Sequence, residues 1–219
     1  MILPGRDHAT MTAPEDRWHS PAADRNKQPI LGQLRAWLPA HGTALEVACG
    51  TGQHACHFAA GLPGWAWWPT DPDPGALASA AAWAADLSAG SPMPRLKPPQ
   101  QLDVTAEPWP LAEPAAPDLV FCANMIHIAP WTACIGLLRG TSARLAPGGA
   151  LVLYGPFLGT GEADAPGNLA FDADLRQRNP LWGVRPLGDV LAAAAGAGLR
   201  LADRATMPAN NLMLLLRRA

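Results

Sequence analysis

Lysine, tyrosine and cysteine are scarce in this chain of 219 residues. Lys27 and Lys97 are the only lysines, and 16 basic against 18 acidic residues give a net charge of −2. This balance lacks the basic stripe with which nucleic-acid-binding proteins neutralise phosphates, so we expect no nucleic-acid partner. The four cysteines form neither a C-x-x-C pair nor a disulfide framework, which favours a reducing compartment, the cytoplasm.

Long apolar runs are also missing. No run approaches the roughly 18 residues of a membrane span, and the first residues lack the charged start and apolar stretch of a signal peptide. We therefore expect a cytoplasmic protein with no membrane partner. Residues 1–16 are polar and punctuated by proline, which predicts a mobile tail. The length and the 49% hydrophobic content predict that residues 17–219 form one domain with a self-sufficient core.

The stretch from Leu45 to His54 predicts a strand that ends in a glycine turn and leads into a helix. Gly50 and Gly52 permit backbone dihedral angles that are closed to other residues. The first N–H groups of the helix then point into a crevice without helical partners, which is typical of a site for an electron-rich ligand group. An ordinary turn between a strand and a helix is the alternative.

Two acidic residues accompany this turn. Glu46 stands four residues before Gly50 at the end of the first strand, and Asp71 follows about twenty residues after the turn. Pro69 predicts that the second strand, from Trp65, ends before Asp71 and leaves this residue in a loop. A carboxylate there can accept both hydroxyls of a ribose, although a helix cap is the alternative role.

Further polar residues follow other predicted strands. Asp103 and Val104 end a short strand over residues 101–104, and Asn124 and His127 follow a buried strand over residues 118–123. The carboxyl ends of parallel strands meet at one edge of a sheet, where ligands bind in such folds. His127 is therefore a candidate general base, although a lone histidine is more often structural.

Two segments flank these strands. Arg25, Asn26 and Lys27 precede an amphipathic helix expected from Ile30 to Leu38, and their donors are suited to a carboxylate or else form a solvated cap. Residues 156–187 break the alternation of strands and helices. Their length and aromatic content predict a lid with a short helix over the site.

The glycine turn resembles the first motif of class I S-adenosylmethionine-dependent methyltransferases, an acid followed by glycines at alternate positions. Glu46, Ala48, Gly50 and Gly52 follow it, with Ala48 in place of the first glycine. Alanine at this point predicts a right-handed or extended backbone. Over residues 20–218 the chain is also similar to a branch known as a domain of unknown function and related to a methyltransferase-like animal protein. Eight segments carry this narrower resemblance: residues 25–31, 45–54, 69–71, 124–131, 154–157, 168–172, 179–185 and 207–212.

The resemblance implies an α/β, Rossmann-like, doubly wound sheet of seven strands, mostly parallel with an antiparallel last strand, and a lid insertion after the fifth strand. It implies S-adenosyl-L-methionine as cofactor and S-adenosyl-L-homocysteine as product. The methyl group would pass in line to an unidentified acceptor, expected to be a small molecule. The implied cofactor-binding residues are Arg25, Asn26, Glu46, Ala48, Gly50, Gly52, Asp71, Asp103, Val104 and Asn124.

For catalysis we expect His127 to take the acceptor's proton and Asn124 to orient the acceptor. Asp172, Arg176 and Trp182 of the lid are expected to contact the substrate. No metal is expected, and the assembly is expected to be a monomer or a homodimer.

Three alternatives stay open. The first is a protein that binds S-adenosylmethionine without catalysis and serves as an interaction module. The second is a nicotinamide-dependent oxidoreductase, which uses the same glycine turn; its short-chain type needs a lysine four residues after a tyrosine, but Leu158 follows Tyr154 at that distance. The third is a metal site, since two cysteines and two histidines lie close together in sequence: Cys49, His54, Cys56 and His57.

Overall fold

The computed structural model of the chain describes residues 17–88, 95–161 and 164–219. The expected tail over residues 1–16 lies outside the described residues. Within them, no helix is long and apolar enough to cross a membrane.

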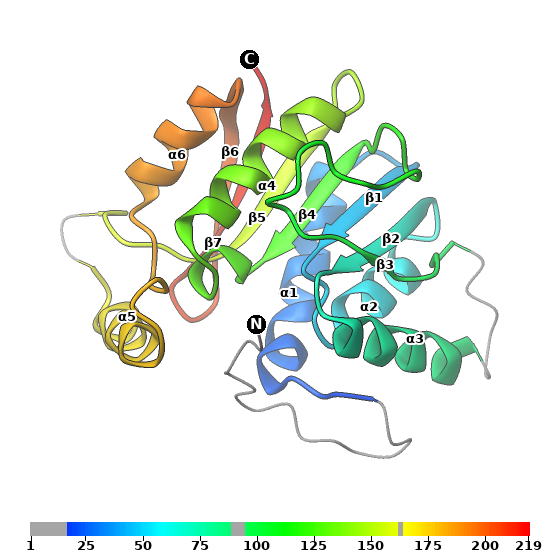
Figure 1. Cartoon of the computed structure of the whole chain (residues 1–219), viewed down its shortest axis with the longest axis horizontal. Coiled ribbons are helices and arrows are strands. Elements are labelled where there is room, and N and C mark those ends of the chain that lie inside the picture. The colour runs from blue at the N-terminus through cyan, green and yellow to red at the C-terminus, as the bar shows by residue number, and fades with distance from the viewer. Residues whose placement is uncertain (1–16, 89–94, 162–163) are drawn as a thin grey trace.

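Seven strands form one sheet in the order β3-β2-β1-β4-β5-β7-β6 (Figure 1). Their bounds are β1 (Gly42–Val47), β2 (Trp65–Asp71), β3 (Gln100–Gln101), β4 (Leu119–Ala123), β5 (Ala150–Pro156), β6 (Leu199–Met207) and β7 (Asn211–Arg218). Strands β1 to β5 pair in parallel, whereas β7 runs antiparallel to both β5 and β6. The predicted fold class is therefore confirmed, including the antiparallel last strand.

Helices cover both faces of the sheet because its central strands are apolar on both sides. On β4, Leu119 and Phe121 face α1 (Pro21–Trp37) and α2 (Gln53–Gly61), while Val120 and Cys122 face the opposite layer. That layer consists of α4 (Trp131–Arg144) and α6 (Leu187–Gly196) (Figure 1). Helix α3 (Pro74–Ser88) packs against α2 and β2.

Helix α1 begins earlier than its hydrophobic spacing predicts. Ser20 caps it by accepting a hydrogen bond from the N–H of Ala23 (3.3 Å), and Pro21 occupies its first turn, where a missing N–H is harmless. Pro29 lies inside the helix. The expected helix from Ile30 is thus corrected to a longer one, and the donors Arg25, Asn26 and Lys27 lie within it.

Two strand boundaries also differ from the prediction. Asp71 is the last residue of β2 and pairs with Gln101, so it does not stand in a loop. The main chain of Trp67 bonds Arg95 and Lys97, on the side of β2 that faces away from β1. Pro69, two residues later, faces the same side, so its missing N–H removes no hydrogen bond to β1 and the strand continues through it. Strand β3 ends at Gln101, so Asp103 and Val104 lie in the loop that follows it.

The lid segment contains α5 (Pro166–Arg178), which lies apart from the two helical layers, at the lower left of Figure 1. Asn168 anchors this helix by donating to the carbonyl oxygens of Phe157 (3.3 Å) and Asn210 (3.2 Å). Leu175 packs with Trp182 and Val184 in a small core of its own. A helix in this segment was predicted, and the structure confirms it.

Candidate functional site

The glycine turn connects β1 to α2 at the carboxyl edge of the sheet. Gly50 and Gly52 have positive φ angles of 54° and 86°, and the N–H of Gly52 donates to the carbonyl of Cys49 (3.0 Å). Ala48 also has a positive φ of 58°. The expectation of a right-handed or extended backbone at Ala48 was therefore wrong: the turn imposes a left-handed conformation that costs an alanine about 1–2 kcal/mol.

The two glycines of the turn differ in their surroundings. A Cβ built on Gly52 would lie 2.4 Å from the Cα of Ala80, so this residue must be glycine for α3 to pack against the turn. Among the described residues, no atom lies within 4 Å of a Cβ built on Gly50. Gly52 thus serves packing, whereas Gly50 borders open space on the side where a ligand is expected.

Asp71 stands beside this open space. Its Oδ2 accepts a hydrogen bond from the N–H of Gly50 (2.9 Å), and its Oδ1 accepts from the N–H of Asp73 (3.0 Å). Burial raises the pKa of this carboxyl, since only 8% of the residue is exposed. Each oxygen keeps a second lone pair for another donor. The structure therefore brings Asp71 and Gly50 together, and their contacts with a cofactor stay a prediction.

Glu46 lies deeper than its predicted role suggests. The residue is 2% exposed, and its Oε2 accepts a hydrogen bond from the indole N–H of Trp67 (2.6 Å). Burial raises the pKa of this carboxyl to about 8, and the nearby charge of Asp71 adds to the rise. Glu46 is therefore protonated at neutral pH and lies inside the protein, so its contact with a ligand stays a prediction.

The pKa of Glu46 predicts how stability depends on pH. Between its unfolded pKa of 4.5 and its folded pKa of about 8, only the folded protein holds the proton, so the free energy of unfolding falls as pH rises through this range. His54 and His127 act in the opposite sense: burial lowers their pKa values to about 4 and about 3, so stability falls as pH drops below 6.5. Below pH 6.5 the two histidines outweigh the single glutamate, so urea unfolding is expected to show a stability maximum near pH 6.5.

The variant Glu46→Gln tests this assignment, because glutamine keeps an acceptor for Trp67 but cannot ionise. This variant is expected to lose the fall in the free energy of unfolding above the stability maximum, and to keep the fall at acidic pH. Glu113→Gln, which changes an exposed glutamate, is the control and should retain both. If the free energy of unfolding of Glu46→Gln fell with rising pH as it does in the wild type, the assignment would be wrong.

Helix α1 contributes polar groups to the same edge of the sheet. Oδ1 of Asn26 accepts from the ring N–H of His54 (2.6 Å), and the Asn26 amide lies beside the phenol of Tyr154. Arg25 is exposed and lies near Tyr154, where its charge lowers the pKa of the phenol against the larger raising effect of burial. Asn26 is thus held by His54 and lies beside Tyr154, while Arg25 is exposed at the surface next to them.

Asp103 and Val104 occupy the loop after β3. Oδ1 of Asp103 accepts from the N–H (2.9 Å) and the hydroxyl (2.7 Å) of Thr105, so the side chain shapes its own loop. The carbonyl of Val104 accepts from the indole of Trp109 (3.1 Å). Asp103 remains exposed. Its local bonds use one carboxylate oxygen, and its contact with an adenine remains a prediction.

His127 is held firmly between β4 and the lid. Its Nδ1 accepts a hydrogen bond from the main-chain N–H of Arg185 (3.4 Å), and its carbonyl accepts from Gly183 (2.9 Å). Nε2 of the ring is buried and has no hydrogen-bond partner among the described residues. With 0% exposure, mainly burial lowers the pKa of this histidine to about 3.

Asn124 and Arg185 border this histidine. Asn124 has a positive φ of 61°, and its side-chain oxygen and Nε2 of His127 lie 3.2 and 2.6 Å from a Cβ built on Gly155. The guanidinium of Arg185 donates to the carbonyls of Ile126 (2.9 Å), Ala129 (2.8 Å) and Leu181 (2.8 Å). Arg185 therefore ties the lid to the loop that carries Asn124 and His127.

The predicted lid residues make bonds within the lid itself. Asp172 accepts from Nε of Arg176 (2.8 Å) and from the N–H of Val184 (2.8 Å). Trp182 is buried at 5% exposure beneath the guanidinium of Arg178, which lies 5.3 Å from its ring. These residues hold α5 against the segment that follows it. Their contacts with a substrate remain predictions.

The residues of the alternative metal site do not form a cluster. His54 bonds Asn26, and His57 lies 3.0 Å from the side-chain oxygen of Gln28. In the part of the chain that the structure describes, no group of three or more histidine, cysteine, aspartate or glutamate side chains is placed to hold a metal ion.

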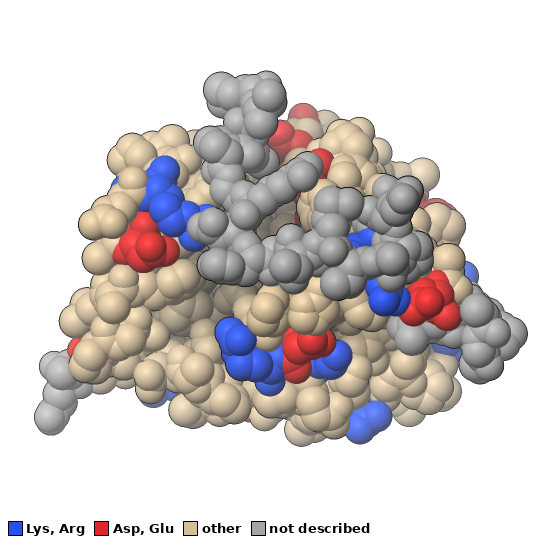
Figure 2. Space-filling view, turned by 90° about the horizontal axis from the view of Figure 1, so that it is seen from below, with Lys and Arg blue, Asp and Glu red and all other residues tan. Residues whose placement is uncertain are grey.

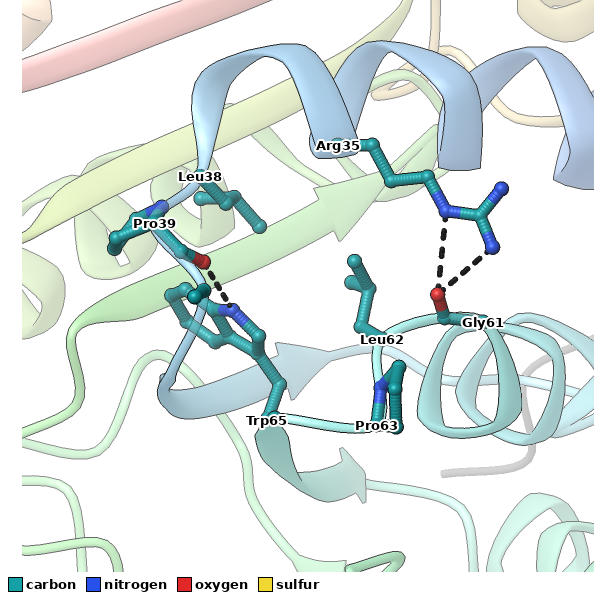
Figure 3. Close-up of a pocket in the computed structure, with 9 residues that line it drawn as sticks. Arg35, Leu38, Pro39, Gly61, Leu62, Pro63 and Trp65 are labelled. Carbon is teal, nitrogen blue, oxygen red and sulfur yellow. Dashed lines mark hydrogen bonds between the residues drawn. The ribbon is translucent and has the colours of Figure 1, made fainter.

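A hollow of about 230 Å³ lies at the opposite, amino-terminal edge of the strands (Figure 3). It lies between the ends of α1 and α2, where Arg35 donates to the carbonyl of Gly61 (2.9 Å) and the indole of Trp65 donates to Pro39 (2.9 Å). None of the predicted site residues lines it.

The face toward which the parallel strands run carries mixed charges. Outside its grey atoms, Figure 2 shows small groups in which basic and acidic side chains lie together. Ion pairs among the described residues include Lys27 with Asp24 (2.6 Å) and Arg176 with Asp172 (2.8 Å). The described part of this face therefore has paired charges rather than a field of one sign.

Sequence reasoning gave no role to three residues that shape the site. Gln53 and Tyr154 contact α1, and Arg185 fastens the lid. Gln53 begins a predicted helix and Tyr154 lies near the end of a predicted strand, so their positions indicate that they lie near the site. Their partners are distant in sequence and could not be predicted. Nothing local to Arg185 indicates that it bonds three carbonyls.

The fold is similar to those of solved methyltransferases. The mitomycin 7-O-methyltransferase MmcR superposes with a TM-score of 0.73 at 17% identity, and CalO1, a methyltransferase of calicheamicin biosynthesis in its S-adenosylhomocysteine-bound form, with 0.71 at 18%. Each match covers 90% of this chain and 55% of the other. An O-methyltransferase family 2 protein from Planctomyces limnophilus, in complex with apigenin, superposes with a TM-score of 0.70 at 20% identity, covering 93% and 64%. The chain thus spans a little over half the length of these proteins.

These similarities establish the methyltransferase fold for the sheet and its helices. The sequence itself matches a family over residues 17–218, almost the whole of the described part. The chain therefore belongs to the family described as protein of unknown function DUF938.

Proposed function

We propose that this protein is an S-adenosylmethionine-dependent methyltransferase that acts on a small-molecule acceptor. The observation that carries the proposal is the pairing of Gly50, which borders open space, with the carboxylate of Asp71 beside it. Both lie at the carboxyl ends of β1 and β2, where nucleoside ligands bind in folds of this kind. The fold shared with solved methyltransferases supports the proposal.

The residues present fit an adenosyl-methionine ligand. Asp71 has two lone pairs for the ribose hydroxyls, and the loop of Asp103 and Val104 stands after the next strand for the adenine. Arg25 and Asn26 offer donors to the ligand's carboxylate. Glu46 would supply negative charge to its ammonium group from inside the protein, which requires that the buried carboxyl release its proton.

When bound, the ligand supplies an activated methyl group on a sulfonium. The chain's task is to hold the acceptor in line with it, and positioning of this kind contributes about 7–11 kcal/mol. Asn124 is proposed to orient the acceptor. His127, our candidate base, has its pKa lowered to about 3 mainly by burial, so it is neutral at physiological pH and would be a weak base.

The experiment that tests this function compares two ligands by thermal unfolding. S-adenosylhomocysteine at 100 times its dissociation constant is expected to stabilise the protein by about 2.7 kcal/mol, which for a chain of this length raises Tm by roughly 5–10 °C. NADH should leave Tm unchanged. A response to NADH alone would replace the proposal with the nicotinamide-dependent alternative.

A second candidate is a protein that binds S-adenosylmethionine without turnover. The enclosure of His127 favours it, because the residue proposed to take a proton has no exposed surface. If labelled methyl groups pass from S-adenosylmethionine to small molecules of a cell extract, the protein is an enzyme. If the protein binds the cofactor but no label is transferred, it is a non-catalytic binding protein. A cytoplasmic location, a monomer or homodimer, and a relation to an animal methyltransferase-like protein remain predictions.

A further inference from the structure

We propose that residues 17–20, which we call the strap, fasten the glycine turn in its ligand-binding conformation, with Ser79 and Gln53 as positioning residues. The inference rests on the proposed function, because its ligand is S-adenosylmethionine or its product. It adds a binding element to which the sequence analysis assigns no role.

One side of the strap is bound to α3. The N–H of Trp18 donates to Oγ of Ser79 (2.9 Å), and the carbonyl of Trp18 accepts from the indole of Trp83 (2.7 Å). The Trp18 ring lies against Gly75, where a Cβ would stand 2.9 Å from it. Arg17 lies over the ring of Trp83 at 4.4 Å. These contacts hold the strap along α3 from Gly75 to Trp83.

Ser79 links the strap to the glycine turn. Its hydroxyl is fully buried, accepts from Trp18 and donates to the carbonyl of Thr51 (2.9 Å), the residue between the two glycines. The next residue of α3, Ala80, is the one against which Gly52 packs. A single buried hydroxyl therefore connects the strap to the turn at the point where α3 supports it.

The other end of the strap reaches the same residue through Gln53. The N–H of Ser20 donates to Oε1 of Gln53 (2.5 Å), and the hydroxyl of Thr51 donates to the same oxygen (3.0 Å). The Gln53 amide donates to Asp24 of α1 (2.9 Å), and the residue is 3% exposed. Both ends of the strap thus converge on Thr51, one at its carbonyl and one at its hydroxyl.

Two segments that share a buried hydrogen-bond network stabilise each other's conformation. If the turn must hold its positive-φ conformation to bind the ligand, then docking of the strap raises ligand affinity. By thermodynamic reciprocity the ligand stabilises strap docking by the same factor. Weakening the strap should therefore lower affinity without touching any residue proposed to contact the ligand.

The test is calorimetric titration of the full chain with S-adenosylhomocysteine. Trp83→Phe removes one hydrogen bond to the strap, and Ser79→Ala removes the connection to Thr51. Each is expected to raise Kd about tenfold, the upper range for one buried hydrogen bond. Trp65→Phe is the matched control: it removes an indole hydrogen bond to Pro39 at the far edge of the sheet (Figure 3) and should lower Tm but leave Kd unchanged.

Hydrogen exchange provides the reciprocal measurement. Addition of S-adenosylhomocysteine is expected to slow exchange of the Trp18 and Ser20 amides in the wild-type protein, and to slow it less in Ser79→Ala. If the wild type binds the ligand but Trp83→Phe and Ser79→Ala bind it with unchanged Kd, the strap inference is wrong and the proposed function stands. If the wild type does not bind it, both are overturned.

Discussion

Asp71→Asn is expected to weaken S-adenosylhomocysteine binding at least 100-fold. Asparagine keeps one acceptor oxygen and loses the charge, so two hydrogen bonds to an ionised carboxylate, worth about 1.5–3 kcal/mol each, are lost or weakened. The remaining oxygen must also serve the N–H of Gly50 or Asp73, which Asp71 now bonds through separate oxygens. Calorimetry and the ligand-dependent rise in Tm measure the loss.

Asp73→Asn is the matched control for this variant. Asp73 lies two residues away and likewise accepts a main-chain N–H, that of Gly75 (2.8 Å), but it is not proposed to contact the ligand. It should lose some stability and keep its affinity within about threefold, less than 1 kcal/mol. Equal loss of affinity in both variants would show that Asp71 acts only by shaping the loop.

Alanine at the two glycines of the turn is expected to lower stability by very different amounts. Gly52→Ala forces a methyl group to 2.4 Å from the backbone of Ala80 and adds the strain of a positive φ. Overpacking and strain together should lower the free energy of unfolding by at least about 3 kcal/mol, or lower Tm by roughly 10 °C. The methyl group of Gly50→Ala meets no neighbour among the described residues, so this variant should lose only about 1 kcal/mol.

Ligand affinity should separate the same two variants. The methyl group of Gly50→Ala enters the space proposed for the ligand, so it is expected to weaken S-adenosylhomocysteine binding while the protein stays folded. Urea unfolding measures the free energy of unfolding of each variant, and calorimetry measures its Kd for S-adenosylhomocysteine. A Gly50→Ala variant that binds as tightly as the wild type would place the ligand elsewhere.

Local signals were sufficient to predict much of the fold. Gly50 and Gly52 marked the turn, and the apolar run of residues 118–123 marked a central strand, because these features depend on nearby residues alone. The start of α1 had a signal too: Ser20 followed by Pro21 is typical of a helix N-terminus. It was outweighed by the hydrophobic spacing that begins at Ile30.

Other features depend on contacts between distant residues and could not be read from a local pattern. Sterics alone argue against a positive φ at Ala48, yet the turn between β1 and α2 imposes one. Burial of His127 follows from its bonds to Gly183 and Arg185, more than 50 residues further along the chain. Glu46 bonds Trp67 on the neighbouring strand, which no spacing within β1 indicates.

A crystal structure of the protein with S-adenosylhomocysteine tests the central claim most directly. The account predicts that the ribose hydroxyls donate to the carboxylate of Asp71 and that the ligand passes over Gly50, with its amino-acid end toward Asn26. A ligand bound elsewhere, or an Asp71 carboxylate that points away from the ribose, would contradict it.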